Sequence, residues 1–205
     1  MTTTRTRAVL VAFTATAALA LAACGGGDDS AGTAHASHSA AGGGTASASA
    51  GAHNAQDVSF AQTMIPHHRQ ALEMASLAAD HASSAQVKDL AARIEKAQDP
   101  EINTMTGWLK AWGEEVPMAG MDHTGHGGMA GMMSDKDMTM LKQSKGKDFD
   151  TMFLTMMVQH HQGAVQMAGT EQAKGAYAPA TGMAGAIVTG QNAEIEEMNK
   201  LLGKG

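Results

Sequence analysis

The sequence contains one segment twice, and this repeat limits the possible folds more than any other feature. A shift of 93 residues aligns residues 57–109 with residues 150–202 without a gap, and 16 of the 53 aligned positions are identical. The identical positions include the dipeptides His67-His68 and His160-His161. A repeat of this length indicates one structural unit used twice, with its two copies packed together around a shared core.

Each copy has the pattern of two amphipathic helices. From Asp57 to Ala78, similar residues recur at alternating steps of three and four, which is the spacing of one face of a helix. A second stripe with the same spacing runs from Ala91 to Trp112. We therefore predict an all-α fold, an antiparallel four-helix bundle made of two repeated helical hairpins, residues 57–113 and 148–203.

Local signals refine this prediction. Ser83 and Ser84 are candidate N-caps for the second helix, and Pro66 should kink the first helix or remove one of its backbone hydrogen bonds. The two hairpins are joined by a connection over residues 114–134, and a short additional helix is expected over residues 134–144. The folded domain is predicted to span residues 56–205.

The N-terminus resembles the signal peptide of a bacterial lipoprotein. Arg5 and Arg7 precede an apolar stretch that is too short to span a membrane. The stretch ends in small residues followed by Cys24, the only cysteine of the chain. We predict cleavage after residue 23, lipidation of Cys24, and a flexible Gly/Ala/Ser-rich tether over residues 24–55. The predicted location is extracytoplasmic, with the protein anchored to the membrane by lipid.

Composition excludes several classes of protein. The formal net charge is −6 and no basic run is present, which argues against nucleic-acid binding. A single cysteine allows neither an internal disulfide nor a cysteine-based zinc finger. The motifs Glu-x-x-His, His-Glu-x-x-His and Gly-x-Ser-x-Gly are absent, which disfavours a di-iron oxidase, a metalloprotease and an α/β-hydrolase.

Polar residues interrupt the predicted core stripes at matching places in both copies. His67 and His160 lie on the stripe of the first helix, with His68 and His161 on its flank, and a glutamate lies on the second stripe. One interpretation is a pair of buried His–Glu hydrogen bonds that fix helix register; the other is a metal site inside the bundle. The candidate ligands are His67, His68, His160, His161, Glu101, Glu194 and the neighbouring methionines Met64, Met74, Met157 and Met167.

The connection between the hairpins is rich in methionine and histidine and lacks branched aliphatic residues. Glycine fills the gaps, so the segment is not typical of a packed core. Thioethers and imidazoles on a flexible loop could bind a soft ion, and methionine selects Cu(I) while imidazole suits copper in both oxidation states. The candidate ligands here are Met118, Met121, His123, His126, Met129, Met132 and Met133.

The doubled motif also resembles a known bacterial family. Both copies read F-x-x-x-M-x-x-H-H-x-x-A-x-x-M-A, at residues 60–75 and 153–168. This motif is similar to that of the domain-of-unknown-function family numbered three hundred and five. The resemblance implies a ferritin-like helical bundle outside the cytoplasm that is associated with metal, chiefly copper, and it implies no catalytic residues.

These observations favour a lipid-anchored copper-binding protein, not an enzyme, that sequesters or buffers the ion. Two alternatives stay open: a redox enzyme that oxidises Cu(I) in the bundle core, and a structural module whose His–Glu pairs bind nothing. If the histidines keep their ordinary pKa of about 6.5, metal binding should weaken between about pH 7 and pH 5.

Overall fold

The computed structural model describes residues 51–118 and 129–204. Within these ranges the chain is helical and contains no strand. The helices are α1 (Ala55–Ser76), α2 (Ala78–His81), α3 (Ala85–Trp112), α4 (Asp135–Gln143), α5 (Gly146–Lys174) and α6 (Ala178–Leu201).

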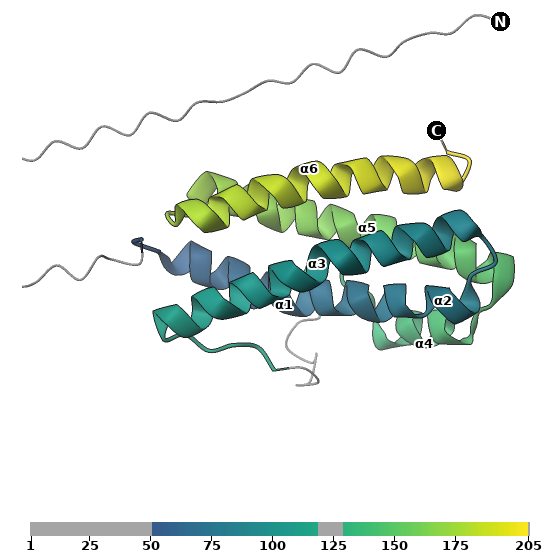
Figure 1. Ribbon diagram of the computed structural model, residues 1–205, viewed down its shortest axis with the longest axis horizontal. Coiled ribbons are helices and arrows are strands. Elements are labelled where there is room, and N and C mark those ends of the chain that lie inside the picture. Colours follow the sequence, from purple (N-terminus) through teal and green to yellow (C-terminus); the bar gives the residue numbers. More distant parts are fainter. Residues whose placement is uncertain (1–50, 119–128, 205) are drawn as a thin grey trace, which may run out of the picture. The chain divides into compact units, whose positions relative to one another are not determined.

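The four long helices α1, α3, α5 and α6 form an antiparallel bundle (Figure 1). α1 packs against α3 within the first hairpin and against α5 across the bundle, and α5 packs against α6. The predicted bundle of two helical hairpins is confirmed. The start of α3 and the start of α5 share one apolar cluster, so these two helices run in the same direction. The chain between them must therefore travel the length of the bundle, as does the long crossover of a ferritin-like fold.

The helix ends follow local sequence signals. Asn54 caps α1 by accepting hydrogen bonds from the backbone N–H groups of Gln56 and Asp57, and its own N–H donates to the Asp57 carboxylate at 2.6 Å. Ser84 caps α3, as predicted. Ser134 caps α4, which corresponds to the short helix expected in this region. These caps satisfy backbone N–H groups that have no partner inside a helix.

A layer of buried polar side chains divides the core of the bundle. One apolar cluster contains Leu90 and Phe153, and the other contains Phe60 and Leu109. On each long helix, polar residues stand between the positions that belong to the two clusters. We call these residues the polar layer: His67, His68, Gln98, His160, His161 and Gln191.

The sequence placed the last residues of the tether outside the folded part, and the structure differs there. The ring of His53 stacks on Trp112 with 4.4 Å between the ring centroids. Tyr177 packs edge-on against both Trp108 and Trp112. The folded part thus begins a few residues earlier than predicted, because an aromatic cluster at this end of the bundle holds His53. The predicted signal peptide, Cys24 and the tether through residue 50 lie outside the described residues.

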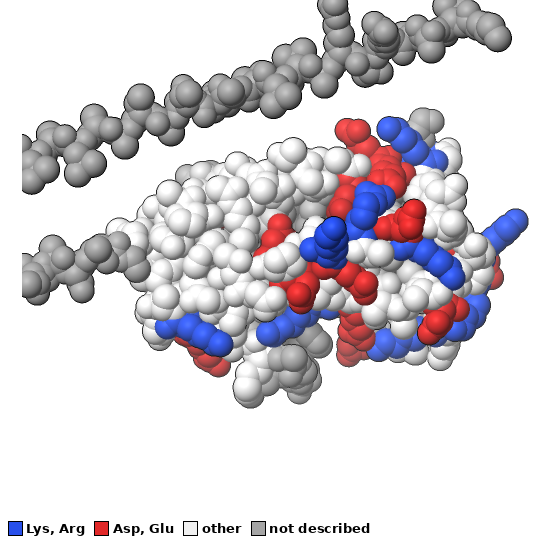
Figure 2. All heavy atoms as spheres, viewed as in Figure 1, with Lys and Arg blue, Asp and Glu red and all other residues white. Residues whose placement is uncertain are grey.

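Charged side chains of both signs are interspersed on the face shown in Figure 2, and they gather over the half that contains the start of α3 and the end of α6. Arg93 on α3 and Glu197 on α6 form an ion pair there at 2.5 Å. Among the described residues, no helix is both long enough and apolar enough to span a membrane.

Candidate metal centre

Two histidines from equivalent positions of the repeat meet in the middle of the bundle. His67 on α1 and His160 on α5 have ring centroids 3.7 Å apart, with the ring planes tilted by 36°. The side chains are 0% and 1% exposed. Equivalent residues of a two-fold repeat approach each other only near its axis, so this pair marks the pseudo-symmetric centre of the polar layer.

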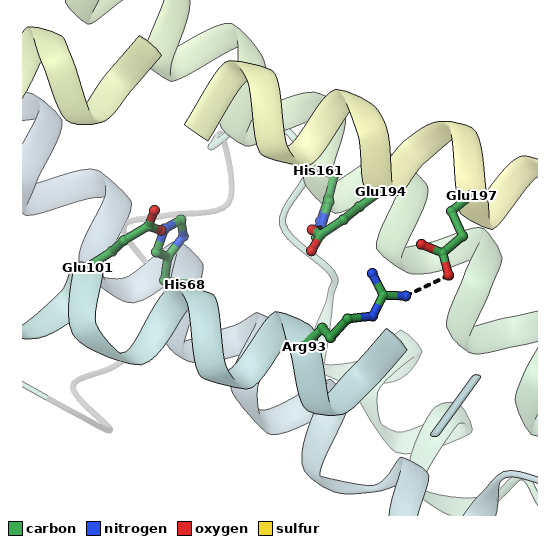
Figure 3. A network of polar contacts seen from close by, with 6 residues as sticks. All are labelled: His68, Arg93, Glu101, His161, Glu194 and Glu197. Atoms are coloured by element: carbon green, nitrogen blue, oxygen red, sulfur yellow. Dashed lines mark hydrogen bonds and ion pairs between the residues drawn. The ribbon is translucent and has the colours of Figure 1, made fainter. Parts of the chain in front are cut away.

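The other two histidines of the layer each bind a glutamate. His68 Nε2 lies 2.7 Å from Glu101 Oε2, and His161 Nε2 lies 2.7 Å from Glu194 Oε2. Figure 3 shows each histidine beside its glutamate, which comes from α3 in one pair and from α6 in the other. The glutamates on the core stripes therefore pair with the flanking histidines and leave His67 and His160 free of carboxylate. Each pair ties the two helices of one hairpin together.

Several ring nitrogens in the layer have no hydrogen-bond partner among the described residues. They are Nδ1 of His67, His68 and His161, and both nitrogens of His160. The Nε2 atom of His67 lies 3.2 Å from the carbonyl oxygen of Ala130. A buried polar atom without a partner is unfavourable, so these nitrogens are available to a ligand that enters the layer.

Burial keeps the central pair uncharged. Burial and the neighbouring His68 lower the pKa of His67 to about 3, and burial together with the charge of His67 lowers the pKa of His160 well below 6.5. Neutral imidazole is the form that binds metal. Solvated histidines would lose metal to protons between pH 7 and pH 5. For these two buried rings we expect the competition with protons to begin at lower pH.

The four helix methionines lie on both sides of the polar layer. Met64 and Met167 belong to the apolar cluster on one side, and Met74 and Met157 belong to the cluster on the other. Met64, Met74 and Met157 are fully buried, while Met167 is partly exposed. Met64 lies one turn before His67 on α1, and Met157 precedes His160 by one turn on α5. These two thioethers are therefore the ones nearest the central pair along the chain.

The end of the methionine-rich connection is docked on this layer. Gln70 on α1 forms two hydrogen bonds with the backbone of Met133, at 2.8 and 2.9 Å. Met129, Met132 and Met133 are half-buried, whereas Met118 at the other end of the connection is 61% exposed. Met121, His123 and His126 lie outside the described residues. The segment 129–133 is thus a fixed part of the site.

Sequence reasoning missed the residues that hold this segment. Position 163 matches position 70 in the repeat, and glycine stands there in place of glutamine. A Cβ atom at Gly163 would overlap the carbonyl oxygen of Ala130, and one at Gly131, where φ is +81°, would lie 2.7 Å from the carbonyl oxygen of Gln159. A glycine inside a helix costs about 1 kcal/mol relative to alanine. This unexplained glycine was the available signal for a close backbone approach.

Replacing Gly163 by alanine should displace residues 130–133 from α5. The backbone N–H of Met133 should then exchange with deuterium faster, because its bond to Gln70 depends on the docked position. Gly169→Ala on the same helix is the matched control, since nothing lies within 4 Å of its added Cβ. That variant should be stabilised by up to about 1 kcal/mol. Unchanged exchange at Met133 in Gly163→Ala would contradict the docking.

The arrangement favours a site with few ligands. Across residues 51–118 and 129–204, no three His, Cys, Asp or Glu side chains are grouped so that they could hold a metal ion. The donors that the structure brings together at the centre are the imidazoles of His67 and His160, while Glu101 and Glu194 are engaged by His68 and His161. Such a donor set suits a transition-metal ion better than an ion that requires an oxygen cage.

Comparisons with solved structures find the same fold. A protein of the DUF305 family from Streptomyces coelicolor is 31% identical over 73% of this chain and 93% of its own, with a TM-score of 0.66. A DUF305 fragment from Deinococcus radiodurans is 31% identical over 74% and 97%, also with a TM-score of 0.66. CopM in its Cu(II)-bound form is 34% identical over 72% and 95%, with a TM-score of 0.63.

A search of curated proteins found no match to the sequence. The family described as "Domain of unknown function (DUF305)" matches residues 57–202, which include both copies of the repeat and the connection between them. The chain belongs to the DUF305 family.

Proposed function

We propose that this protein binds copper as Cu(I) in the polar layer, with His67 and His160 as the central ligands. The observation that carries the proposal is the buried, uncharged imidazole pair with three nitrogens that lack a hydrogen-bond partner among the described residues. An imidazole nitrogen binds a transition metal such as zinc at about 2.0–2.1 Å. Two imidazole nitrogens on opposite sides of one ion therefore lie about 4 Å apart. The rings of His67 and His160, whose centroids are 3.7 Å apart, would have to separate and each turn one nitrogen toward the ion.

The surroundings favour copper over harder ions. Met64 and Met157 flank the pair along α1 and α5, and thioethers select Cu(I). The related protein CopM has been crystallised in Cu(I)-bound, Cu(II)-bound and Ag-bound forms. The candidate ligands in the connection, Met121, His123 and His126 among them, are part of the proposal as additional capacity for the ion.

The proposed role is sequestration or buffering of copper outside the cytoplasm. A lipid on Cys24 would hold the protein at the membrane, and two or more acyl chains suffice for stable anchoring. Methionine and histidine suit this compartment because, unlike cysteine, they cannot form disulfides there. A mature protein that starts at Cys24 and carries the mass of acyl groups would support this part of the proposal; an unmodified Cys24 would refute it.

The two His–Glu pairs support a structural role for the outer part of the layer. His68 and Glu101 join α1 to α3, and His161 and Glu194 join α5 to α6. Removing one partner of such a pair leaves a buried polar group without its hydrogen bond, at a cost of about 1–3 kcal/mol. These four residues hold the helices in register, and His67 with His160 carries the proposed ion.

Titration of the metal-free domain with Cu(I) against a competing chelator tests the proposal. His67→Leu combined with His160→Leu should weaken the tightest site by about a hundredfold or more, because loss of residues that merely support a ligand already costs about 10–100-fold. His53→Ala is the control, since this histidine stacks on Trp112 outside the layer. Equal affinity in the double variant and the control would refute the central site.

A further inference from the structure

The groove between α4 and α5 is lined by methionine in a way that the central site does not explain. The groove has a volume of about 1000 Å³ and opens to solvent. Its other lining residues are polar or charged, and every large apolar side chain on its wall is a methionine. These are Met133, Met140, Met152 and Met156. Gln159 lies at the groove as well, next in sequence to His160.

Three separately anchored segments supply these four side chains. Met133 is fixed by its two backbone hydrogen bonds to Gln70. α4 buries Met138 and Leu141 against the bundle, which leaves Met140 37% exposed toward the groove. Met152 and Met156 are one turn apart on α5, so they share a face of that helix.

The walls of the groove are held in place by contacts outside it. Lys142 on α4 pairs with Glu73 on α1 at 2.6 Å. The Nδ1 atom of His81 lies 2.9 Å from the carbonyl oxygen of Ser144, at the end of α4. The groove therefore exists before any ligand binds.

Packing alone does not account for this composition. Met156 is 8% exposed and packs in the core, but Met140 is 37% exposed and Met133 and Met152 are partly exposed. At these three positions leucine would pack as well, and a methionine that solvent reaches is prone to oxidation. What methionine adds is a soft thioether on a side chain with three rotatable bonds, so sulfur atoms from different segments can converge on one ion. Asp137 and Asp148 outnumber Lys145 on the wall, which gives the groove a net negative charge that favours entry of a cation.

We infer that the α4–α5 groove is a second metal site, which binds a soft monovalent ion through the thioethers of Met133, Met140, Met152 and Met156. The choice of ion rests on the proposed function, whereas the site itself uses none of the polar-layer ligands. Its donors are thioethers only, so it should prefer Ag(I) and Cu(I) over zinc.

Binding of Ag(I), which has the softness of Cu(I) without its redox chemistry, tests the site. The groove variant replaces Met133, Met140, Met152 and Met156 by leucine, and the control replaces four methionines outside the groove, Met105, Met138, Met183 and Met198. Leucine nearly conserves the volume of methionine, so both variants should fold. The groove variant should bind about one Ag(I) fewer than the control in native mass spectra. Equal stoichiometry in the two variants would overturn the inference.

The rate at which peroxide oxidises each methionine can be measured in the wild-type chain, which tests the site without any substitution. Met140 and Met152 should be oxidised more slowly once Ag(I) is added, because a bound thioether is no longer free to react. Met183, partly exposed on α6 and outside the groove, is the internal comparison. The His67→Leu/His160→Leu variant should keep this protection, which separates the groove from the central site. Oxidation of Met140 and Met152 that Ag(I) does not slow would overturn the inference even if the central site binds copper.

Discussion

The metal-free protein is expected to lose about 2 kcal/mol or more of stability from its two central histidines between pH 7 and pH 5. The pKa of His67 falls to about 3 in the folded chain and that of His160 lies well below 6.5, whereas both return to about 6.5 on unfolding. Below pH 6.5 the unfolded chain therefore takes up protons that the folded chain does not. The stabilisation is complete above pH 6.5 and is lost as the pH falls. At pH 5, 1.5 units lower, His67 costs about 2 kcal/mol, and His160 adds a loss of the same sign.

Denaturant unfolding of metal-free wild type and of the His67→Leu/His160→Leu variant measures this loss. The stability of the variant relative to wild type should rise by about 2 kcal/mol or more from pH 7 to pH 5. Taking the difference between the two proteins cancels the titration of groups that both contain. A difference that stays constant over this range would mean that the two histidines are protonated in the folded state, contrary to their burial.

Glu171 has the opposite effect on the pH dependence of stability, so the comparison of wild type with the variant is necessary. Glu171 is fully buried, and burial together with the neighbouring carboxylate of Asp57 raises its pKa to about 7. Its contribution to stability is complete below its unfolded pKa, about 4.5, and is lost as the pH rises through 7. Wild type alone would thus show a smaller acid effect than the histidines produce.

The repeat made the fold predictable, because each copy carries two helical stripes and neither copy can bury its stripes alone. The same symmetry explains the central pair. His67 and His160 occupy the same position on the core-facing stripe, and such residues meet if their helices pair across the axis. The sequence did not show that α1 packs against α5, because an apolar stripe shows which face of a helix is buried but not which helix covers it.

The repeat could not predict the position of the docked connection, because this segment has no equivalent in the other copy and breaks the two-fold symmetry. Gln70 and Gly163 are equivalent positions, yet one bonds Met133 and the other makes room for Ala130. Because glutamine and glycine differ, these two positions are not among the matching residues of the repeat. The glutamates show a related limit. Their place on the core stripe predicted a buried partner, but the partner proved to be the flanking histidine, one residue from the one on the stripe.

The second large effect on stability is expected from the aspartates at the start of each repeat, Asp57 and Asp150. Asp57 on α1 accepts hydrogen bonds from the backbone N–H groups of Ala176 and Tyr177, in the turn of the second hairpin, at 3.1 and 3.0 Å. Its equivalent, Asp150 on α5, accepts bonds from Ser83 and Ser84, in the turn of the first hairpin. Each hairpin thus holds the turn of the other. The two contacts lie at opposite ends of the bundle, as the two apolar clusters show.

Asp57→Ala should destabilise the protein by about 3 kcal/mol or more. Asp57 is fully buried, and its removal leaves the N–H groups of Asn54, Ala176 and Tyr177 without an acceptor, at about 1–3 kcal/mol for each that water cannot reach. Asp150→Ala is the matched control. Its carboxylate is only partly buried and its bond to Ser83 is exposed, so water can replace it and the loss should stay near 1 kcal/mol.

The variant that combines Asp57→Ala with Asp150→Ala shows whether the two aspartates stabilise the protein independently or as one network. Sites more than about 7–10 Å apart without common partners add within about 0.5 kcal/mol. Because Asp57 and Asp150 act at opposite ends, their free-energy losses in denaturant unfolding should sum. Equal losses of stability in the two single variants would contradict the role of burial. A double variant as stable as Asp57→Ala alone would show that the Asp150 contact adds nothing once the Asp57 contact is lost.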